Sequence, residues 1–406
     1  MTRRLGAMIA VAWLAAVAPL GAQAAADLPP WRLSWFPYFT VSPNNGFMGI
    51  AHAILFRQAP YDDRVSLREA VSVDAGYSTR DAWLVRVEGS LPRLADGWRL
   101  QATAEASRSP RFGDPDTAQD LSRQSIGMEV TRRLTGRLQL AVRGGAEHLR
   151  DGLTIAMADQ LYPTAPIDSP CFLIDPNPEL PPQPGGSCSE ATLRQSDVSA
   201  RVALVIDLRD REFNTRQGAL LEGGIFAGSA VDGYRGLYAM VRGWLSPGER
   251  THVTGRIGLR ALSSAAAVGI GHTLPGWERS FTTFGGAESE RGLSEGRYPG
   301  RGLLLGAAEL RQDVVRVKDI FAVSLLGFVD AGRPFHDVEI IPPLCPGCTT
   351  SSRSWSGGKL RLTLNGWTVS GGGGVGVRVL RNAIMTVTAA RGEGRMRWYV
   401  SSGWSW

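Results

Sequence analysis

The feature that most constrains the fold is a two-residue alternation that recurs along the chain and gathers charges on one side. In the segment Trp98–Ser107, alternate residues are apolar or small, and the residues between them include Arg99 and Glu105. The segment Val253–Ala261 repeats this pattern, with Arg256 on its charged side. Successive side chains of a β-strand point to opposite faces, so each segment predicts a strand with one apolar and one charged face. Strands of about 9–11 residues with these two faces are typical of a transmembrane β-barrel, in which one face meets lipid and the other a wet lumen.

The same alternation predicts an all-β, antiparallel transmembrane barrel of about sixteen strands. They are expected to begin near residues 33, 46, 67, 82, 98, 122, 137, 195, 218, 234, 251, 302, 320, 370, 383 and 397. The long connections, near 108–121, 150–194, 264–301 and 332–369, all follow odd-numbered strands. If the first strand runs outward, every long connection is external and the periplasmic turns are short, as in outer-membrane barrels. The turn around Tyr61–Val65 is the one periplasmic connection that is longer than this pattern expects.

The first 24 residues are typical of a secretory signal peptide. Arg3 and Arg4 precede the apolar run Leu5–Ala18, and Ala22-Gln23-Ala24 supplies a cleavage site of small residues. No later stretch reaches the roughly 18 consecutive apolar residues of a transmembrane helix. We therefore expect a signal peptide over residues 1–24 and a barrel over residues 25–406, located in the bacterial outer membrane and surrounded by its lipid.

The charges and the cysteines exclude some classes of function. The net charge of +6 comes almost wholly from arginines spread along the chain, whereas a nucleic-acid partner requires a clustered patch. After export, Cys171 with Cys188 and Cys345 with Cys348 are most simply disulfides that clasp loops. A redox or metal role for the second pair stays open, although no matching Cys or His pair has zinc spacing. We expect no metal and no other cofactor.

A glycine-rich stretch, Phe284–Gln312, leads directly into a predicted strand. A phosphate-binding loop instead opens a helix and carries Gly-Lys-Ser/Thr, which this stretch lacks. We therefore place it at the end of the external loop between the eleventh and twelfth strands. The five histidines are scattered and no Gly-x-Ser-x-Gly elbow occurs, so the sequence also argues against an enzyme.

Four segments resemble the bacterial surface antigen superfamily, which contains the barrels of the outer-membrane assembly factor BamA, of TamA and of the two-partner-secretion transporters. The stretch "GGAESERGLSEGRYPGRGLLLGAAELR" resembles the Arg-Gly-aromatic loop and following Glu-x-Arg strand of this superfamily. Asp207–Gly224 is similar to its Arg-Asp…Gly periplasmic turn, Gly327–Arg333 to its Phe-x-Asp-x-Gly strand, and "GVGVRVLRNAIMTVTAARGEG" to its penultimate hairpin. The resemblance covers the C-terminal half and implies a sixteen-stranded barrel, whereas the N-terminal half matches in pattern only.

The resemblance also implies that the external loop folds back into the lumen, where its arginine pairs with the acidic residue of the Phe-x-Asp-x-Gly strand. In this chain the pair is Arg291 and Asp330, and Gly292 allows a close approach. We expect Glu309 and Arg311, which also face inward, to complete the network, and we call these five residues the loop lock. The alternative is that they are ordinary solvated lumen charges. The superfamily has Tyr or Phe after Arg-Gly, where this chain has Leu293.

The alternation independently supports an inward Asp330. Asp330 falls on the side of its predicted strand opposite Leu325 and Val329, and a charged side chain that faces lipid destabilises a barrel. An Arg–carboxylate pair in a partly dry lumen can be bidentate and hold a loop in place.

The resemblance implies a non-enzymatic barrel for protein assembly or translocation. A seam between the first and last strands, near Trp31, Trp35 and Gly403, is expected to receive a client polypeptide. Superfamily members usually carry periplasmic domains before the barrel, but the predicted first strand begins soon after Ala25, so we expect a bare barrel that can borrow a separate periplasmic partner. The alternative is a passive pore or a structural barrel.

The last strand looks like the signal that outer-membrane assembly machinery reads when it inserts a barrel. In "MRWYVSSGWSW" the alternation places Trp398, Trp404 and Trp406 on one face, and the chain ends on an aromatic residue. Interfacial aromatic residues are common on transmembrane barrels. We therefore expect the assembly machinery to be a partner during insertion of this protein.

Overall fold

The structure is a computed structural model. It describes residues 29–60, 63–113, 119–154, 167–168, 190–230, 233–263, 268–277, 281–298, 300–318, 320–335, 367–380 and 383–404. The predicted signal peptide, the four cysteines and Trp406 lie outside the described residues, so the expected cleavage and disulfides stay predictions.

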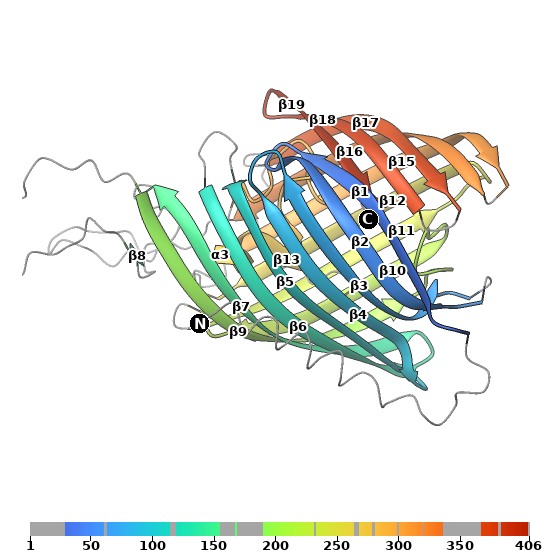
Figure 1. Cartoon of the computed structure of the whole chain (residues 1–406), viewed down its shortest axis with the longest axis horizontal. Coiled ribbons are helices and arrows are strands. Elements are labelled where there is room, and N and C mark those ends of the chain that lie inside the picture. Colours follow the sequence, from blue (N-terminus) through green and yellow to red (C-terminus); the bar gives the residue numbers. More distant parts are fainter. Residues whose placement is uncertain are drawn as a thin grey trace, which may run out of the picture.

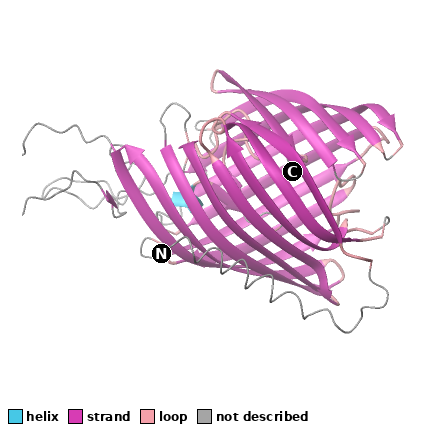
Figure 2. Ribbon diagram, viewed as in Figure 1, coloured by secondary structure: helices cyan, strands magenta, loops and turns pink. Residues whose placement is uncertain are grey.

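Sixteen antiparallel strands of the described residues close into one barrel (Figures 1 and 2). They are β1 (Arg32–Ser42), β2 (Gly46–Gln58), β3 (Leu67–Ser78), β4 (Trp83–Ala95), β5 (Trp98–Phe112), β6 (Gln119–Thr135), β7 (Leu138–Thr154), β9 (Glu190–Asp207), β10 (Gly218–Gly228), β11 (Tyr234–Leu245), β12 (Thr251–Leu262), β15 (Gly302–Val317), β16 (Phe321–Phe335), β17 (Thr368–Val379), β18 (Ala383–Gly392) and β19 (Arg395–Ser402). The two-residue strand β8 (Ile167–Asp168) pairs with β9. The predicted all-β barrel of sixteen strands is confirmed.

Several strands are longer than the 9–11 residues expected of a membrane span. β6 and β7 each have 17 residues and β9 has 18. The connection predicted at 108–121 was therefore wrong in extent, because β5 continues to Phe112 and β6 begins at Gln119. A strand that continues beyond the lipid meets water on both faces, so its residues there need not alternate between apolar and polar. The predicted strands ended where this alternation ended.

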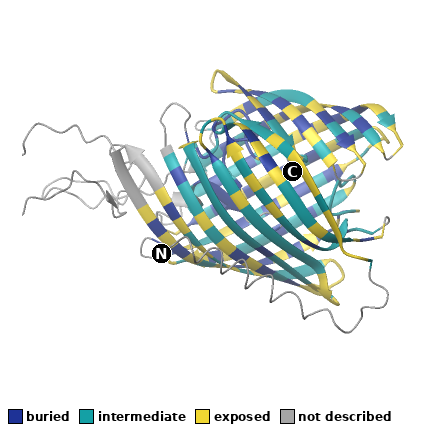
Figure 3. Cartoon of the chain, viewed as in Figure 1, coloured by how far each residue is buried: buried dark blue, intermediate teal, exposed yellow. Residues whose placement is uncertain are grey.

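Burial alternates from residue to residue along the strands (Figure 3). In β12, Ile257 is 63% exposed while its neighbour Arg256 is 4% exposed, and in β16 Leu325 is exposed while Ser324 is buried. The exposed positions are largely apolar, as a lipid-facing surface requires. A closed barrel with an apolar outer surface and a charged lumen is the architecture of a bacterial outer-membrane protein, and it places the chain in that membrane. Among the described residues, no helix is long and apolar enough to cross a membrane.

The loop between β12 and β15 carries secondary structure of its own. It contains the short helix α3 (Val268–Gly271) and a hairpin of β13 (Thr273–Pro275) and β14 (Phe281–Thr283), which form a sheet separate from the barrel. We call its described residues, 268–277, 281–298 and 300, the β12–β15 loop.

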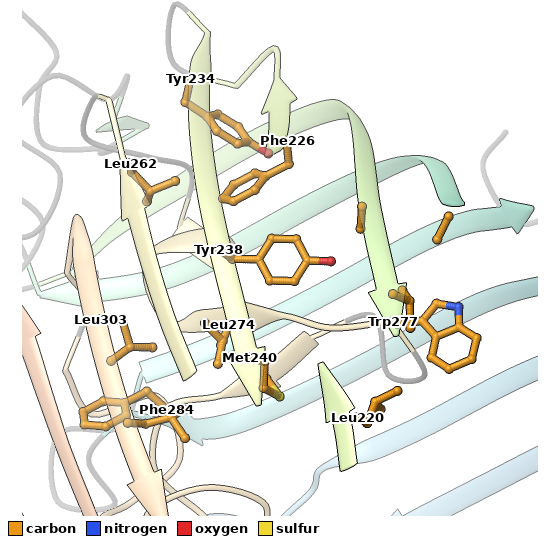
Figure 4. Close-up of a cluster of buried hydrophobic side chains, with 14 of the residues drawn as sticks. Leu220, Phe226, Tyr234, Tyr238, Met240, Leu262, Leu274, Trp277, Phe284 and Leu303 are labelled. Atoms are coloured by element: carbon orange, nitrogen blue, oxygen red, sulfur yellow. The ribbon is translucent and has the colours of Figure 1, made fainter. Parts of the chain in front are cut away.

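The largest cluster of buried apolar side chains joins this loop to the barrel strands (Figure 4). Leu274, Trp277 and Phe284 come from the loop, Tyr238 comes from β11 and Leu303 from β15. The neighbours of Tyr238 in β11 are more exposed than it is, so the cluster lies on the inner face of the barrel wall. Each large apolar side chain buried in this way contributes about 1.5–3 kcal/mol, and the cluster therefore helps to hold the loop against the wall.

The barrel closes where the first strand meets the last. β1 pairs with β2 along its whole length, from Arg32 with Phe56 to Ser42 with Gly46. Between β1 and β19, in contrast, the register among the described residues is the single pair Val41 with Val400. We call this junction the seam, and its short ladder makes it the least paired junction of the described barrel.

Candidate functional site

Arg291 is completely buried and binds carboxylates of two neighbouring strands. Its Nε lies 2.8 Å from Asp330 Oδ2 and its Nη2 lies 2.8 Å from Asp330 Oδ1, which makes the pair bidentate. The backbone N–H of Arg291 also donates to Asp330 Oδ2 at 3.1 Å. Nη1 donates to Glu309 Oε2 at 2.6 Å. A planar guanidinium is suited to such fork-shaped binding, because its N–H groups are fixed in one plane.

The surroundings of Arg291 keep it charged. Burial lowers the pKa of Arg291, but hydrogen bonds and charge attraction from Asp330 and Glu309 outweigh burial and raise it. The guanidinium carbon also lies 3.3 Å from the centroid of the Phe328 ring, and cation–π contacts of this kind strengthen when they are desolvated. The site therefore holds a permanent positive charge on the β12–β15 loop against negative charges on the barrel wall.

Arg311 extends this network toward the end of the chain. Its Nε donates to Glu309 Oε1 at 2.6 Å, so Glu309 receives one arginine on each oxygen. The guanidinium carbon of Arg311 lies 4.3 Å from the centroid of the Trp404 ring. Two arginines and two carboxylates thus balance in charge, as buried ionic groups must.

Gly292 lies against three other strands, β17, β18 and β19. Its N–H donates to Ser370 Oγ of β17 at 3.1 Å, and its carbonyl accepts from Arg397 of β19. A Cβ at this position would overlap the Cβ of Ser370 and lie 2.9 Å from the Cα of Gly392. The structure thus brings together Arg291, Gly292 and the other three residues named from the sequence.

Leu293 occupies the position at which the resembling superfamily has an aromatic residue. Its side chain is completely buried in the apolar cluster of the lumen. Its carbonyl accepts a hydrogen bond from the hydroxyl of Tyr399 at 3.1 Å. The substitution therefore retains an apolar contact at this position of the loop.

Sequence reasoning missed the role of Arg260, which binds backbone rather than a carboxylate. Its guanidinium donates to the carbonyls of Thr273 at 2.6 Å and Gly271 at 3.1 Å, and also to those of Ile270 and Gly300. These carbonyls belong to both ends of the β12–β15 loop, whose ends are also joined by the Gly300 N–H to Gly271 carbonyl bond of 3.0 Å. The alternation predicted that Arg260 faces inward but not that it binds these carbonyls, because every residue has a backbone carbonyl and the sequence does not distinguish the ones that it binds.

Glu290 was also missed. Its side chain is buried, and its Oε2 accepts from Thr368 Oγ1 at 2.7 Å, while Oε1 has no hydrogen-bond partner among the described residues. Burial, helped by the charge of Asp330, raises the pKa of Glu290 to about 8. A carboxyl group placed directly before Arg291 is therefore neutral near pH 7.

We expect docking of the β12–β15 loop to weaken as the pH rises from about 4.5 to about 8. Glu290 has an ordinary pKa of 4.5 in a released loop and about 8 in the docked loop, so only the released form loses its proton in this window. Burial raises the pKa of Glu295 to about 7, which acts in the same direction. Burial lowers the pKa of His272 from 6.5 to about 3 in the docked loop. Below pH 6.5 only the released loop protonates this histidine, so His272 opposes docking there.

The variant Glu290→Gln isolates this carboxyl group, because its amide stays neutral at every pH. The measurement is the open fraction in single-channel recordings of the protein in planar bilayers at pH 5, 6.5 and 8.5. Wild type is expected to open several-fold more at pH 8.5 than at pH 5, and Glu290→Gln to lose most of that increase. Glu249→Gln makes the same chemical change at an exposed position in the turn between β11 and β12 and serves as the control. An unchanged pH dependence in Glu290→Gln would contradict the assignment.

The expected common face for Trp398 and Trp404 was wrong. β19 ends at Ser402, and Gly403 adopts a positive φ of 86°, which redirects the chain. Trp398 is exposed on the outer face, whereas Trp404 stacks on the inward Arg311 and donates from Nε1 to Asn214 Oδ1 at 3.3 Å. The proposed reading of these tryptophans by assembly machinery stays a prediction.

The comparisons with known proteins agree with this architecture. No protein-family model matches the sequence, and no curated protein matches it either. The structure is similar to that of BamA from Haemophilus ducreyi lacking POTRA domains 1-3, with a TM-score of 0.54 and 12% identity over 92% of this chain and 70% of that chain. It is also similar to CdiB from Escherichia coli, with a TM-score of 0.51 and 12% identity over 92% of this chain and 63% of that chain.

These likenesses concern the fold, because 12% identity is too low to carry more. The chain covers less than two thirds of the length of CdiB. Strand number, closure and apolar outer surface all agree with a membrane barrel of this type. The chain therefore has the barrel fold of BamA and CdiB, as its resemblance to the bacterial surface antigen superfamily implied.

Proposed function

We propose that this chain is a protein-assembly or translocation barrel of the bacterial outer membrane, and that it works without enzymatic chemistry. The observation that carries the proposal is the buried Arg291 bound to Asp330 and Glu309, inside a barrel with the fold of BamA and CdiB. The loop lock holds the β12–β15 loop in the lumen while no client is present. A client polypeptide, delivered directly or by a separate periplasmic partner, then enters through the seam.

The edge of β1 supports entry at the seam. From Arg32 to Thr40, before Val41, the register with β19 gives no pair among the described residues, so backbone groups on this edge of β1 are available to another strand. Leu33 and Trp35 on the same stretch are 71% and 77% exposed, the highest values among the large apolar side chains that the structure describes. An exposed strand edge flanked by apolar side chains is a template for pairing with a second chain.

One cluster of side chains contains the residue types of a hydrolase triad, but its distances argue against catalysis. His252 Nδ1 lies 2.7 Å from Ser246 Oγ, and its Nε2 lies 3.8 Å from Asp313 Oδ2. The second distance is too long for a hydrogen bond, and Ser246 Oγ also donates to the carbonyl of Arg216 at 2.9 Å. A nucleophilic serine needs its proton directed to an oriented base. Ester or lipid hydrolysis that Ser246→Ala abolishes would overturn the non-enzymatic proposal.

The test is single-channel conductance of the wild type, Arg291→Ala and Asp330→Ala in planar bilayers. The wild type is expected to be mostly closed with brief openings, and both variants to conduct more, or more erratically, because the loop loses its main charged anchor. Arg201→Ala removes another buried lumen arginine, which pairs with Glu129 at 2.6 Å between barrel strands, and serves as the matched control. It is expected to conduct like the wild type.

Equal and steady conductance in all four proteins would favour the alternative function, a passive pore or a structural barrel. In that case the loop lock would only stabilise the lumen wall. A rise in Arg291→Ala and Asp330→Ala alone would support a gated lumen of the kind that assembly and translocation require.

A further inference from the structure

We propose that the segment Gly292–Arg297 of the β12–β15 loop is a clasp that spans the seam. It binds the turn between β1 and β2 on one side and β19 with its preceding turn on the other. The seam then opens only after the loop has moved. This inference rests on the proposed function, since it names what controls access to the same seam.

The first half of the clasp is Asn44, in the turn between β1 and β2. Its side chain is 1% exposed, and its Oδ1 accepts from the backbone N–H of Glu295 at 3.1 Å. Its Nδ2 donates to the carbonyl of Arg111 in β5 at 2.6 Å. The N–H of Gly113 donates to the carbonyl of Glu295 at 2.8 Å. The loop is thus fastened to the hairpin that begins the barrel and to the neighbouring end of β5.

The second half of the clasp belongs to β19 and to the turn before it. Arg397 donates to the carbonyls of Gly292 and, at 3.1 Å, Gly392, and the Tyr399 hydroxyl donates to the Leu293 carbonyl at 3.1 Å. In the turn, Glu393 Oε2 lies 3.2 Å from Arg297 Nε. Consecutive residues of one loop therefore bind the last strand of the barrel.

The two halves face each other across the seam. Asn44 follows Val41 by three residues and Arg397 precedes Val400 by three, so both lie on the same side of the registered pair. Both residues are buried and bind loop residues only three positions apart, Glu295 and Gly292. The clasp thus supplies hydrogen bonds at the end of the seam that holds the registered pair Val41 with Val400, opposite the unpaired stretch of β1 that contains Leu33 and Trp35.

The clasp is continuous with the loop lock. Arg291, which binds Asp330 of β16, directly precedes Gly292, which binds β19 through its carbonyl. Movement of Arg291 out of its carboxylate site would pull the first residue of the clasp away from the seam. One event therefore releases the loop and unfastens the junction at which a client would enter.

The test is amide hydrogen exchange of the protein in lipid nanodiscs, read on peptides that contain Val41 and on peptides of β19. Asn44→Ala and Tyr399→Phe each remove a side-chain partner of the loop while leaving Arg291, Asp330 and Glu309 in place. Each is expected to speed exchange at the seam by about fivefold, the effect of one lost net hydrogen bond on an opening equilibrium. Exchange in β10 and β11, on another part of the wall, is expected to stay unchanged.

Matched controls make the same chemical changes elsewhere. Asn45→Ala removes the neighbouring amide, which accepts from Ser109 rather than from the loop, and Tyr77→Phe removes a hydroxyl bound to Asp81. Wild-type exchange at the seam in Asn44→Ala and Tyr399→Phe would overturn the clasp, whatever the conductance of Arg291→Ala. Faster seam exchange in both variants, with wild-type conductance in Arg291→Ala and Asp330→Ala, would support the clasp and reject the gated function.

Discussion

Replacing Arg291 with alanine is expected to lower the free energy of unfolding of the barrel by about 3–5 kcal/mol, the usual effect of removing one partner of a buried ion pair. The change leaves Asp330 buried at 1% exposure without the guanidinium that binds both of its oxygens. An uncompensated carboxylate in a dry site must either be protonated or draw water into the lumen. The measurement is urea unfolding of the barrel refolded into lipid vesicles, followed by tryptophan fluorescence.

Arg86→Ala is the control for this loss. Arg86 pairs with a single carboxylate, at 2.8 Å from Glu105 Oε2, but its side chain is 42% exposed. Partly exposed pairs contribute about 0–1 kcal/mol, because water solvates each partner after the other is removed. Equal losses in Arg86→Ala and Arg291→Ala would show that Arg291 is an ordinary solvated lumen charge.

A double variant separates two contributions to the stability loss: the cost of leaving Asp330 buried without a partner, and the loss of the ion pair itself. Arg291→Met combined with Asp330→Leu removes both charges and keeps apolar volume at each position. Replacing both members of a buried pair is often neutral, so the double variant is expected to recover much of the stability that Arg291→Ala loses. It should nevertheless keep the raised conductance, because the loop no longer has its directional anchor.

Substituting alanine for Gly292 is expected to displace the loop and to cost about 1–3 kcal/mol, the range for overpacking a filled site. The added Cβ would overlap the Cβ of Ser370 and lie 2.9 Å from the Cα of Gly392. Both obstacles belong to sheet strands that cannot move without disturbing their ladders. The measurements are the same urea unfolding curve and the conductance of the variant, which should resemble that of Arg291→Ala.

Gly327→Ala tests whether the effect of Gly292 comes from its close contacts. Gly327 lies in β16, the strand of Asp330, but a Cβ there meets no heavy atom within 4 Å. It is expected to change stability little. Adding Ser370→Gly to Gly292→Ala removes the nearer obstacle and should restore part of the stability, so no recovery in that pair would contradict the steric explanation.

Strand positions could be predicted from the sequence because lipid and lumen water impose opposite chemistry on the two faces of each strand. The predicted starts of β2, β3, β5 and β10 at residues 46, 67, 98 and 218 are those of the structure. The largest difference is at β9, predicted near 195 and found at Glu190. That strand has 18 residues, more than the roughly 9–11 of a membrane span, and lipid imposes alternation only within the span.

The inward direction of each charge could be predicted for the same reason, but its partner could not follow from alternation. The pairing of Arg291 with Asp330 was expected through resemblance to a known superfamily. The side chain of Arg260 faced inward as the pattern required, yet its backbone partners depend on how the loop folds. The position of the Trp404 side chain was predicted wrongly, because the positive φ of Gly403 interrupts the two-residue alternation that would place it on the same face as Trp398.

By itself the sequence determined the barrel, the number and placement of its strands and the face on which each charge lies, because these depend on local period and on the cost of exposing charge to lipid. Only the tertiary structure decided which inward groups meet. Asn44 and Glu295 are 251 residues apart, and closure of the barrel brings them to opposite ends of one hydrogen bond. The same closure buries Glu290 beside Asp330 and leaves the seam with a single registered pair. Such contacts arise from long-range geometry, which no local pattern of residues encodes.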